Sequence, residues 1–130
     1  MRIKIGIPWS VKIFTWLLIC AGIFFGFVFF TNPGMSFPGA SITDYSSQLG
    51  FYSTGVRVFG SVIALFISVI LNNPYFLIIT LISRISIEIG DVIVNILLKG
   101  SQTNTIMISV IAIFEIWAVL KLYKTIKTGN

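Results

Sequence analysis

Four long runs of apolar residues, separated by shorter polar segments, dominate the chain. They cover residues 13–30, 51–71, 75–98 and 105–123. Each run is close to the length of about 20 residues that an α-helix needs to cross a hydrocarbon layer of about 30 Å. The pattern therefore predicts an all-α membrane protein, a bundle of four transmembrane helices that forms a single domain over residues 1–130.

The polar segments between the runs predict how the helices connect. Residues 31–50 are rich in Gly, Ser and Pro and predict one long loop between the first two helices. The Asn72-Asn73-Pro74 segment predicts a tight turn, with Pro74 as the first residue of the third helix. Gly100 is expected to stop that helix at its C-terminal end.

Basic residues predict the orientation of these helices in the membrane. Six of them lie between the apolar runs and the two chain termini, namely Arg2, Lys4, Lys12, Lys121, Lys124 and Lys127. Only Lys99 flanks the opposite side of the predicted bundle. Because Lys and Arg accumulate on the cytoplasmic side, both termini are predicted to be cytoplasmic and the long loop to lie outside. The net charge of +5 then suits anionic lipid headgroups rather than nucleic acid.

Composition excludes several other classes of protein. Of the 130 residues, 56% are hydrophobic and 10% are charged, whereas soluble domains have about 25% charged residues. Cys20 is the one cysteine and there is no histidine, so we expect no intrachain disulfide, metal site or cofactor. No nucleotide-binding loop or nucleophile motif is present, so nothing in the sequence argues for an enzyme.

A cleaved signal peptide is the alternative interpretation of the first run. That run has about 18 residues, more than the 7–15 of a typical signal-peptide core. The best small-residue cleavage site, Pro38-Gly39-Ala40, has proline at an unfavourable position. We therefore expect the first run to be an uncleaved span.

A line of polar residues follows the third predicted helix. At about 100° per residue, five polar side chains fall within a sector about 80° wide. They are Thr80, Arg84, Glu88, Asp91 and Asn95. The three charged ones cost about 9 kcal/mol at the bilayer centre, while the apolar residues of this helix return about 5–9 kcal/mol. We therefore expect the polar line to face the interior of the bundle.

Two further charged residues lie within neighbouring spans and are the expected partners. At about 1.5 Å per residue, Arg57 of the second span is level with Asp91. Glu115 of the fourth span is level with Glu88 and within one turn of Arg84. The predicted pairs are Arg57–Asp91 near the outer face and Arg84 with Glu88 or Glu115 near the midplane.

These side chains bring two arginines and three carboxylates into the membrane. If all are ionised, one negative charge is uncompensated, so the carboxyl group of Glu88 or Glu115 should be protonated or neutralised by a cation. A proton relay, a cation site or an amine-binding pocket needs such a group. The opposing hypothesis is that the network only fixes helix register. The candidate binding residues are Arg57, Arg84, Glu88, Asp91, Asn95 and Glu115.

Small residues predict two close helix contacts. Gly22 and Gly26, spaced four residues apart, allow close approach of a helix from the same chain or from a second copy. Gly60, Ala64 and Ser68 form a small face on the second span, which is expected to receive the third helix.

The chain resembles the broad DoxX-like group of small four-helix membrane proteins. The likeness rests on size, on four spans, on Arg57-x-x-Gly60 and on Arg84-x-x-x-Glu88-x-x-Asp91. Membership would imply a protein of the bacterial inner membrane, in some members tied to quinol oxidation or thiol redox systems.

Two functions are compatible with these features. The first is a module, as a monomer or a homodimer, that binds or conducts a small ligand, a cation or a proton at the charged site. The second is a structural or accessory subunit of a larger membrane complex, such as a redox complex, with the charges serving assembly. A membrane-bound enzyme is the third and least supported hypothesis.

Overall fold

The computed structural model describes residues 5–37 and 39–129. Within these residues the chain forms four α-helices and one short 3₁₀ helix. The elements are α1 (Trp9–Thr31), η1 (Pro33–Met35), α2 (Tyr45–Ile70), α3 (Pro74–Leu97) and α4 (Gln102–Thr128). The predicted all-α class is thereby confirmed. Arg2 and Lys4 of the orientation prediction, and Pro38 of the rejected cleavage site, lie outside the described residues.

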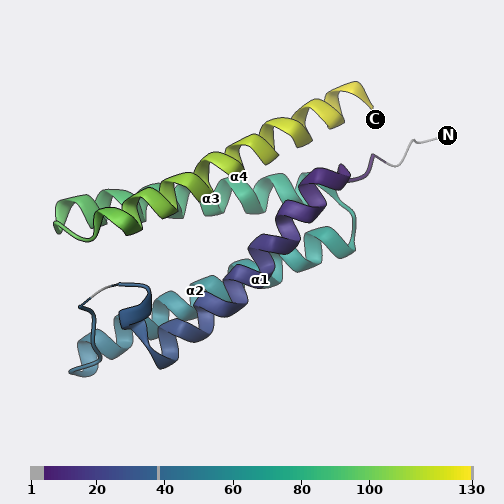
Figure 1. Cartoon of the computed structure of the whole chain (residues 1–130). Coiled ribbons are helices and arrows are strands. Elements are labelled where there is room, and N and C mark those ends of the chain that lie inside the picture. The colour runs from purple at the N-terminus through teal and green to yellow at the C-terminus, as the bar shows by residue number, and fades with distance from the viewer. Residues whose placement is uncertain (1–4, 38, 130) are drawn as a thin grey trace.

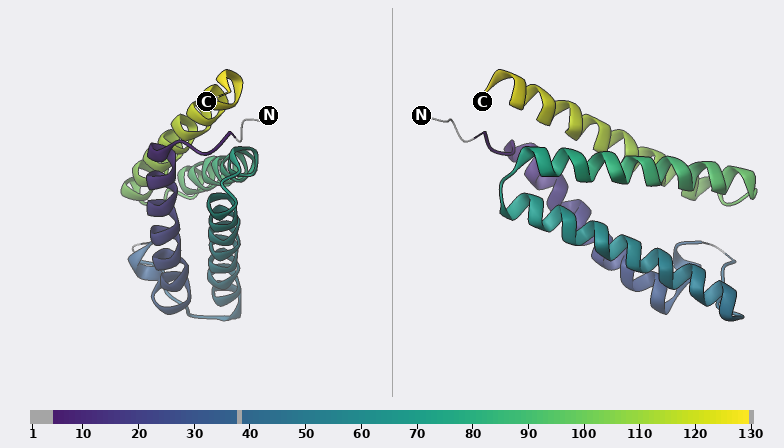
Figure 2. Two further views of the ribbon diagram at one scale, coloured as in Figure 1. Left: turned by 90° about the vertical axis from the view of Figure 1, so that its right-hand side faces the viewer. Right: turned by 180° about the vertical axis from the view of Figure 1, so that it is seen from behind.

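The helices are arranged as two antiparallel hairpins (Figure 1). One hairpin consists of α1 and α2, the other of α3 and α4, and α2 leads directly into α3. The hairpins meet at the end of the molecule where both chain termini lie, and they diverge toward the opposite end (Figure 2). The arrangement is therefore two joined hairpins in which α2 and α3 diverge toward the α1–α2 loop, while the connection after α1 stays in contact with α4, because Asn104 Nδ2 donates to the Ser36 carbonyl (2.6 Å).

The second helix begins earlier than the sequence predicted. It starts at Tyr45 rather than near residue 51, so the connection after α1 is residues 32–44 rather than 31–50. The cause is a capping box: the Asp44 carboxylate accepts a hydrogen bond from the Ser47 amide (2.8 Å), and the Ser47 hydroxyl accepts one from the Asp44 amide (3.2 Å). The bond from the Ser47 amide lowers the pKa of Asp44 below its ordinary value.

The turns at the two ends of α3 agree only in part with the prediction. Pro74 is the first residue of α3, as expected, and the Asn73 side chain caps that helix. At the other end the left-handed residue is Lys99 (φ 52°) and not Gly100. Gly100 is needed for another reason, because a Cβ there would collide with the side chain of Asn95.

The buried core lies at the end of the molecule where the hairpins meet. All four helices contribute to it, and its fully buried members include Val11, Leu65, Leu77, Leu81 and Leu122. Many large apolar side chains elsewhere are exposed, although Val28 and Phe29 near the end of α1 are also buried. A soluble protein rarely exposes so much contiguous apolar surface, so lipid is the medium this exterior fits.

Three helices, α1, α2 and α4, are long and apolar enough to cross a membrane. Their hydroxyl groups suit a medium without water, since Thr15, Ser68 and Ser109 each donate to the backbone carbonyl four residues earlier. The chain thus has the features of an integral membrane protein. Helix α3 has comparable length, but length and composition do not identify it as a span because of its charged residues.

Glycines allow α1 and α2 to pack closely within one chain. A Cβ at Gly22 would collide with Val62, and a Cβ at Gly26 would lie 2.9 Å from the Phe59 ring. The spaced glycines of α1 therefore contact α2. Gly60 differs from them, because a Cβ there would meet no atom within 4 Å.

The substitution Gly22→Ala tests this contact. It should lower the free energy of unfolding by about 1–3 kcal/mol, because the added methyl group overpacks the α1–α2 interface. Unfolding can be followed by fluorescence in detergent, since Trp16 packs edge-on against Phe66 across the same interface. Gly60→Ala is the matched control and should unfold like the wild type. Equal stability of the two variants would contradict the packing described.

Candidate functional site

Arg84 joins three helices through one guanidinium group. From α3 its Nε donates to Glu115 Oε1 of α4 (2.6 Å), and its Nη1 donates to Ser61 Oγ of α2 (2.6 Å). Its Nη2 forms an ion pair with Glu88 Oε1 one turn along α3 (3.0 Å). Arg84 lies three residues beyond Leu81, a fully buried member of the core. We call Arg84, Glu88, Glu115 and Ser61 the charged cluster.

The two carboxyl groups of the charged cluster are buried to different extents. The Glu115 side chain is fully buried, whereas that of Glu88 is 13% exposed. In each group one oxygen binds Arg84, while Oε2 is buried and has no hydrogen-bond partner among the described residues. With both carboxyls ionised the cluster would carry a net charge of −1 in a medium of low dielectric constant. A proton on one Oε2 atom removes that excess charge.

The sequence predicted part of this cluster. Arg84, Glu88 and Glu115 come together as expected, and both of the alternative partners of Arg84 are used. Ser61 was missed as a partner. It lies beside Gly60 on the face expected to receive α3, and that position was the only signal available for it.

The predicted pair between Arg57 and Asp91 is not formed. Both side chains are exposed, and Arg57 Nη2 donates instead to Thr54 Oγ1 (3.3 Å). The pairing prediction measured depth from the outer ends of the apolar runs, which differ from the helix ends. Measured from the α2–α3 turn, Arg57 lies at about 20 Å and Asp91 at about 26 Å. The two charges interact without direct contact between the side chains.

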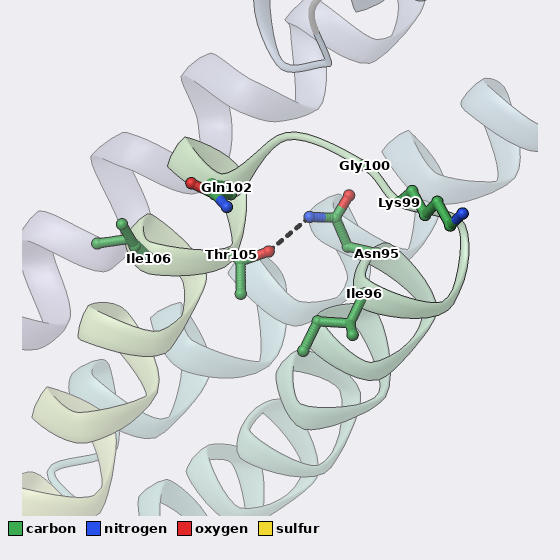
Figure 3. Close-up of a pocket in the computed structure, with 7 residues that line it drawn as sticks. All are labelled: Asn95, Ile96, Lys99, Gly100, Gln102, Thr105 and Ile106. Carbon is green, nitrogen blue, oxygen red and sulfur yellow. Dashed lines mark hydrogen bonds between the residues drawn. The ribbon is translucent and has the colours of Figure 1, made fainter.

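Asn95, the last predicted site residue, belongs to the α3–α4 turn. Its Nδ2 donates to the Ser101 carbonyl (2.9 Å) and to Thr105 Oγ1 (2.7 Å), as Figure 3 shows for Thr105. A hollow of about 450 Å³ lies over this turn. Lys99 borders it, but the Lys99 side chain points away from Asn95 (Figure 3). Asn95 therefore closes the hairpin and lies apart from the charged cluster.

A groove of about 380 Å³ runs between α2 and α3 beside the charged cluster. Arg57, Ser61 and Arg84 all line it. The small face of α2 thus meets α3 only in part, since Gly60 and Ala64 border this open groove. Arg57, although unpaired with Asp91, belongs to the surface next to the cluster.

Removing the guanidinium tests its role in joining the helices. Arg84→Met should lower the free energy of unfolding by about 3–5 kcal/mol, because the buried Glu115 carboxylate loses its counter-charge. Arg57→Met is the matched control and should cost less than about 1 kcal/mol, since Arg57 is exposed. Both values can be measured by denaturant unfolding in detergent. A similar loss in the two variants would contradict the role assigned to Arg84.

Neutralising a carboxyl group in the same background sharpens that test. The double variant Arg84→Met with Glu115→Gln should be more stable than Arg84→Met alone, because one unpaired buried charge is removed. A double variant that is less stable than the single one would show that buried charge is not the cause of the loss.

Comparison of the chain with protein-family models, with curated proteins and with solved structures gives no match. The resemblance to the DoxX-like group stays a prediction from the sequence. Function therefore has to be inferred from the chemistry of the charged cluster and of the surfaces around it.

Proposed function

We propose that this chain is a small membrane protein that binds and conducts protons at the charged cluster. The observation that carries the proposal is the arrangement of two carboxyl groups on one guanidinium, each with a buried oxygen that has no partner. With both carboxyl groups ionised the cluster has a net charge of −1. With one carboxyl group protonated the cluster is neutral. Uptake and release of a proton thus change the charge of the site between −1 and zero.

A proton suits this site better than a metal cation. Divalent cations such as Ca²⁺ and Mg²⁺ require six or more oxygen ligands. Here the Arg84 guanidinium lies between the carboxyl groups, at 2.6 and 3.0 Å from their oxygens, and would repel a metal ion. A proton needs only one oxygen and a short approach path.

The two carboxyl groups have different parts in this proposal. Glu115 is fully buried and makes the shorter bond to Arg84, so it serves as the constant counter-charge of the guanidinium. Glu88 is partly exposed and makes the longer bond, so it is the group that exchanges a proton. The proton binds Glu88 Oε2, while Oε1 continues to accept the hydrogen bond from Arg84.

The proposal includes α3 as a fourth span, with both termini in the cytoplasm. Helix α3 has 24 residues, enough to cross about 30 Å of hydrocarbon. Its charged residues Arg84 and Glu88 make bonds inside the bundle, which reduces the cost of inserting them. The start of α1 and the end of α4 lie at one end of the molecule (Figure 1), as an even number of spans requires. Lys12 and Lys124 near that end favour the cytoplasmic side.

A structural or accessory role in a larger membrane complex is the second candidate function. It is favoured by the fact that three nitrogens of Arg84 bind groups of the same chain. Such bonding fastens helices without any exchange of protons. Under this alternative, neutralising Glu88 would alter stability or complex formation and leave proton flux at the background of empty liposomes.

Glu88→Gln tests the proposed function. In liposomes with a trapped pH indicator and an imposed membrane potential, the variant should lower proton flux at least tenfold, because glutamine keeps the acceptor for Arg84 and cannot take up the proton. Asp91→Asn is the matched control on the same helix and should conduct like the wild type. Wild-type protein that conducts no protons, or a Glu88→Gln variant with unchanged flux, would refute the proposal.

Cysteine labelling tests the four-span orientation. In a Cys20→Ala background, Ser41→Cys of the α1–α2 loop should react with a membrane-impermeant maleimide on intact cells. Thr128→Cys at the end of α4 should react only after the membrane is permeabilised. Labelling of both positions from the same side would require an odd number of spans and would contradict the place given to α3.

A further inference from the structure

The groove between α2 and α3 has the form of a binding site for an amphiphile. Its volume is about 380 Å³, within the range of about 300–1,000 Å³ found for ligand pockets. The α2 side is lined by small residues, including Gly60 and Ala64, and the α3 side by the exposed apolar residues Ile79 and Ile87. Arg57 supplies a positive charge at the end of the groove nearer to the α1–α2 loop.

The described part of the chain leaves the floor of this groove uncovered. A Cβ at Gly60 would meet no atom within 4 Å, in contrast to Gly22 and Gly26, which contact α2. Because α2 is long and apolar enough to cross a membrane, the molecules available to fill the groove are lipids. An acyl chain fits the part lined by glycine, alanine and isoleucine, while the hydroxyl groups of Ser61, Thr80 and Ser83 and the Arg84 side chain also border the groove.

Arg57 determines the charge and the orientation of the occupant. Its guanidinium forms no ion pair with a carboxylate among the described residues, and it makes one hydrogen bond, to Thr54. Thr54 lies one turn closer to the start of α2, so the guanidinium points along the helix toward the α1–α2 loop. Arg57 lies roughly 10 Å inside the hydrocarbon layer at that end, a depth from which a long arginine side chain reaches toward the phosphates. Asp91 of α3 is near enough for its charge to interact with that of Arg57 but makes no ion pair with it, so the guanidinium keeps hydrogen-bond donors for an anion.

We propose that this groove binds one anionic membrane lipid from the leaflet on the side of the α1–α2 loop. The headgroup phosphate accepts hydrogen bonds from the Arg57 guanidinium, in the geometry that arginine and phosphate favour. One acyl chain extends from there to Gly60, which lies about 15 Å from the α2–α3 turn and so near the bilayer midplane, and its end approaches Ala64 beyond it. The direction of the groove matches a lipid of that leaflet, because Arg57 lies at the end nearer to the α1–α2 loop. The groove shares Ser61 and Arg84 with the charged cluster, but lipid binding at Arg57 does not require proton exchange at Glu88.

Native mass spectrometry of the intact protein in detergent tests the proposal, with phosphatidylglycerol as the probe. Phosphatidylglycerol should bind the wild type more tightly than phosphatidylcholine, and Arg57→Gln should weaken its binding about tenfold, because charge-assisted hydrogen bonds are lost. Gly60→Leu should abolish binding by filling the groove. Gly50→Leu is the matched control, since a Cβ at Gly50 also meets nothing within 4 Å and lies on the same helix outside the groove.

Further arms identify the source of the anion and keep the two proposals separate. Glycerol 3-phosphate, the soluble headgroup, should not displace the lipid, because the acyl chain contributes to binding. Glu88→Gln should bind phosphatidylglycerol like the wild type, so a failed proton assay leaves this result intact. Unchanged binding in Arg57→Gln, equal binding of phosphatidylcholine, or displacement by glycerol 3-phosphate would overturn the proposal. The proposal would also be overturned if the chain formed a dimer that binds no lipid and if Gly60→Leu dissociated that dimer.

Discussion

The Arg84 guanidinium is the interaction on which the arrangement of the helices depends. It reaches α2 through Ser61 and α4 through Glu115, and it belongs to α3. Burying a cation in an apolar medium is costly, so its donors need acceptors and its charge needs a counter-charge. Glu115 and Glu88 supply both the acceptors and the counter-charge. They supply more counter-charge than is needed, since they bring two negative charges to one positive charge. The same surplus that makes the site unusual as a structural joint is what makes it suitable for a proton.

The position of this cluster follows from how the two hairpins pack. Glycines allow α1 and α2 to approach closely, and Asn95 closes the turn of the other hairpin. The hairpins share an apolar core near the start of α1 and the end of α4, where Leu81 and its neighbours are buried, and at the opposite end Asn104 of α4 donates a buried hydrogen bond to the Ser36 carbonyl. Arg84 follows one turn later, so the polar contacts begin where the apolar contacts end. Beyond that level the helices diverge, which leaves the groove next to Arg57 open.

Placement along the helices decided which predicted pairs form. Arg84 and Ser61 lie at about 15 and 14 Å from the α2–α3 turn and meet, whereas Arg57 and Asp91 differ in level by about 6 Å and do not. The prediction for Arg57 took the outer ends of the apolar runs as its reference. Those ends were displaced, because the capping box at Asp44 starts α2 earlier than hydropathy indicates. The depth of a residue in this protein is therefore better measured from a tight turn, such as the α2–α3 turn, than from the end of an apolar run.

The amino-acid sequence alone determined the features that depend on local spacing and on composition. The helical class, the line of charged residues on α3 and the surplus carboxyl group all follow from residue types at helical periodicity, and Arg84, Glu88 and Glu115 were identified in this way. Only the tertiary structure decided which atoms meet. Ser61 enters the cluster, Arg57 faces a groove and Asn95 closes a turn because the angle between the hairpins sets the distances between helices. That angle results from the sum of many packing contacts, which no single periodicity in the sequence encodes.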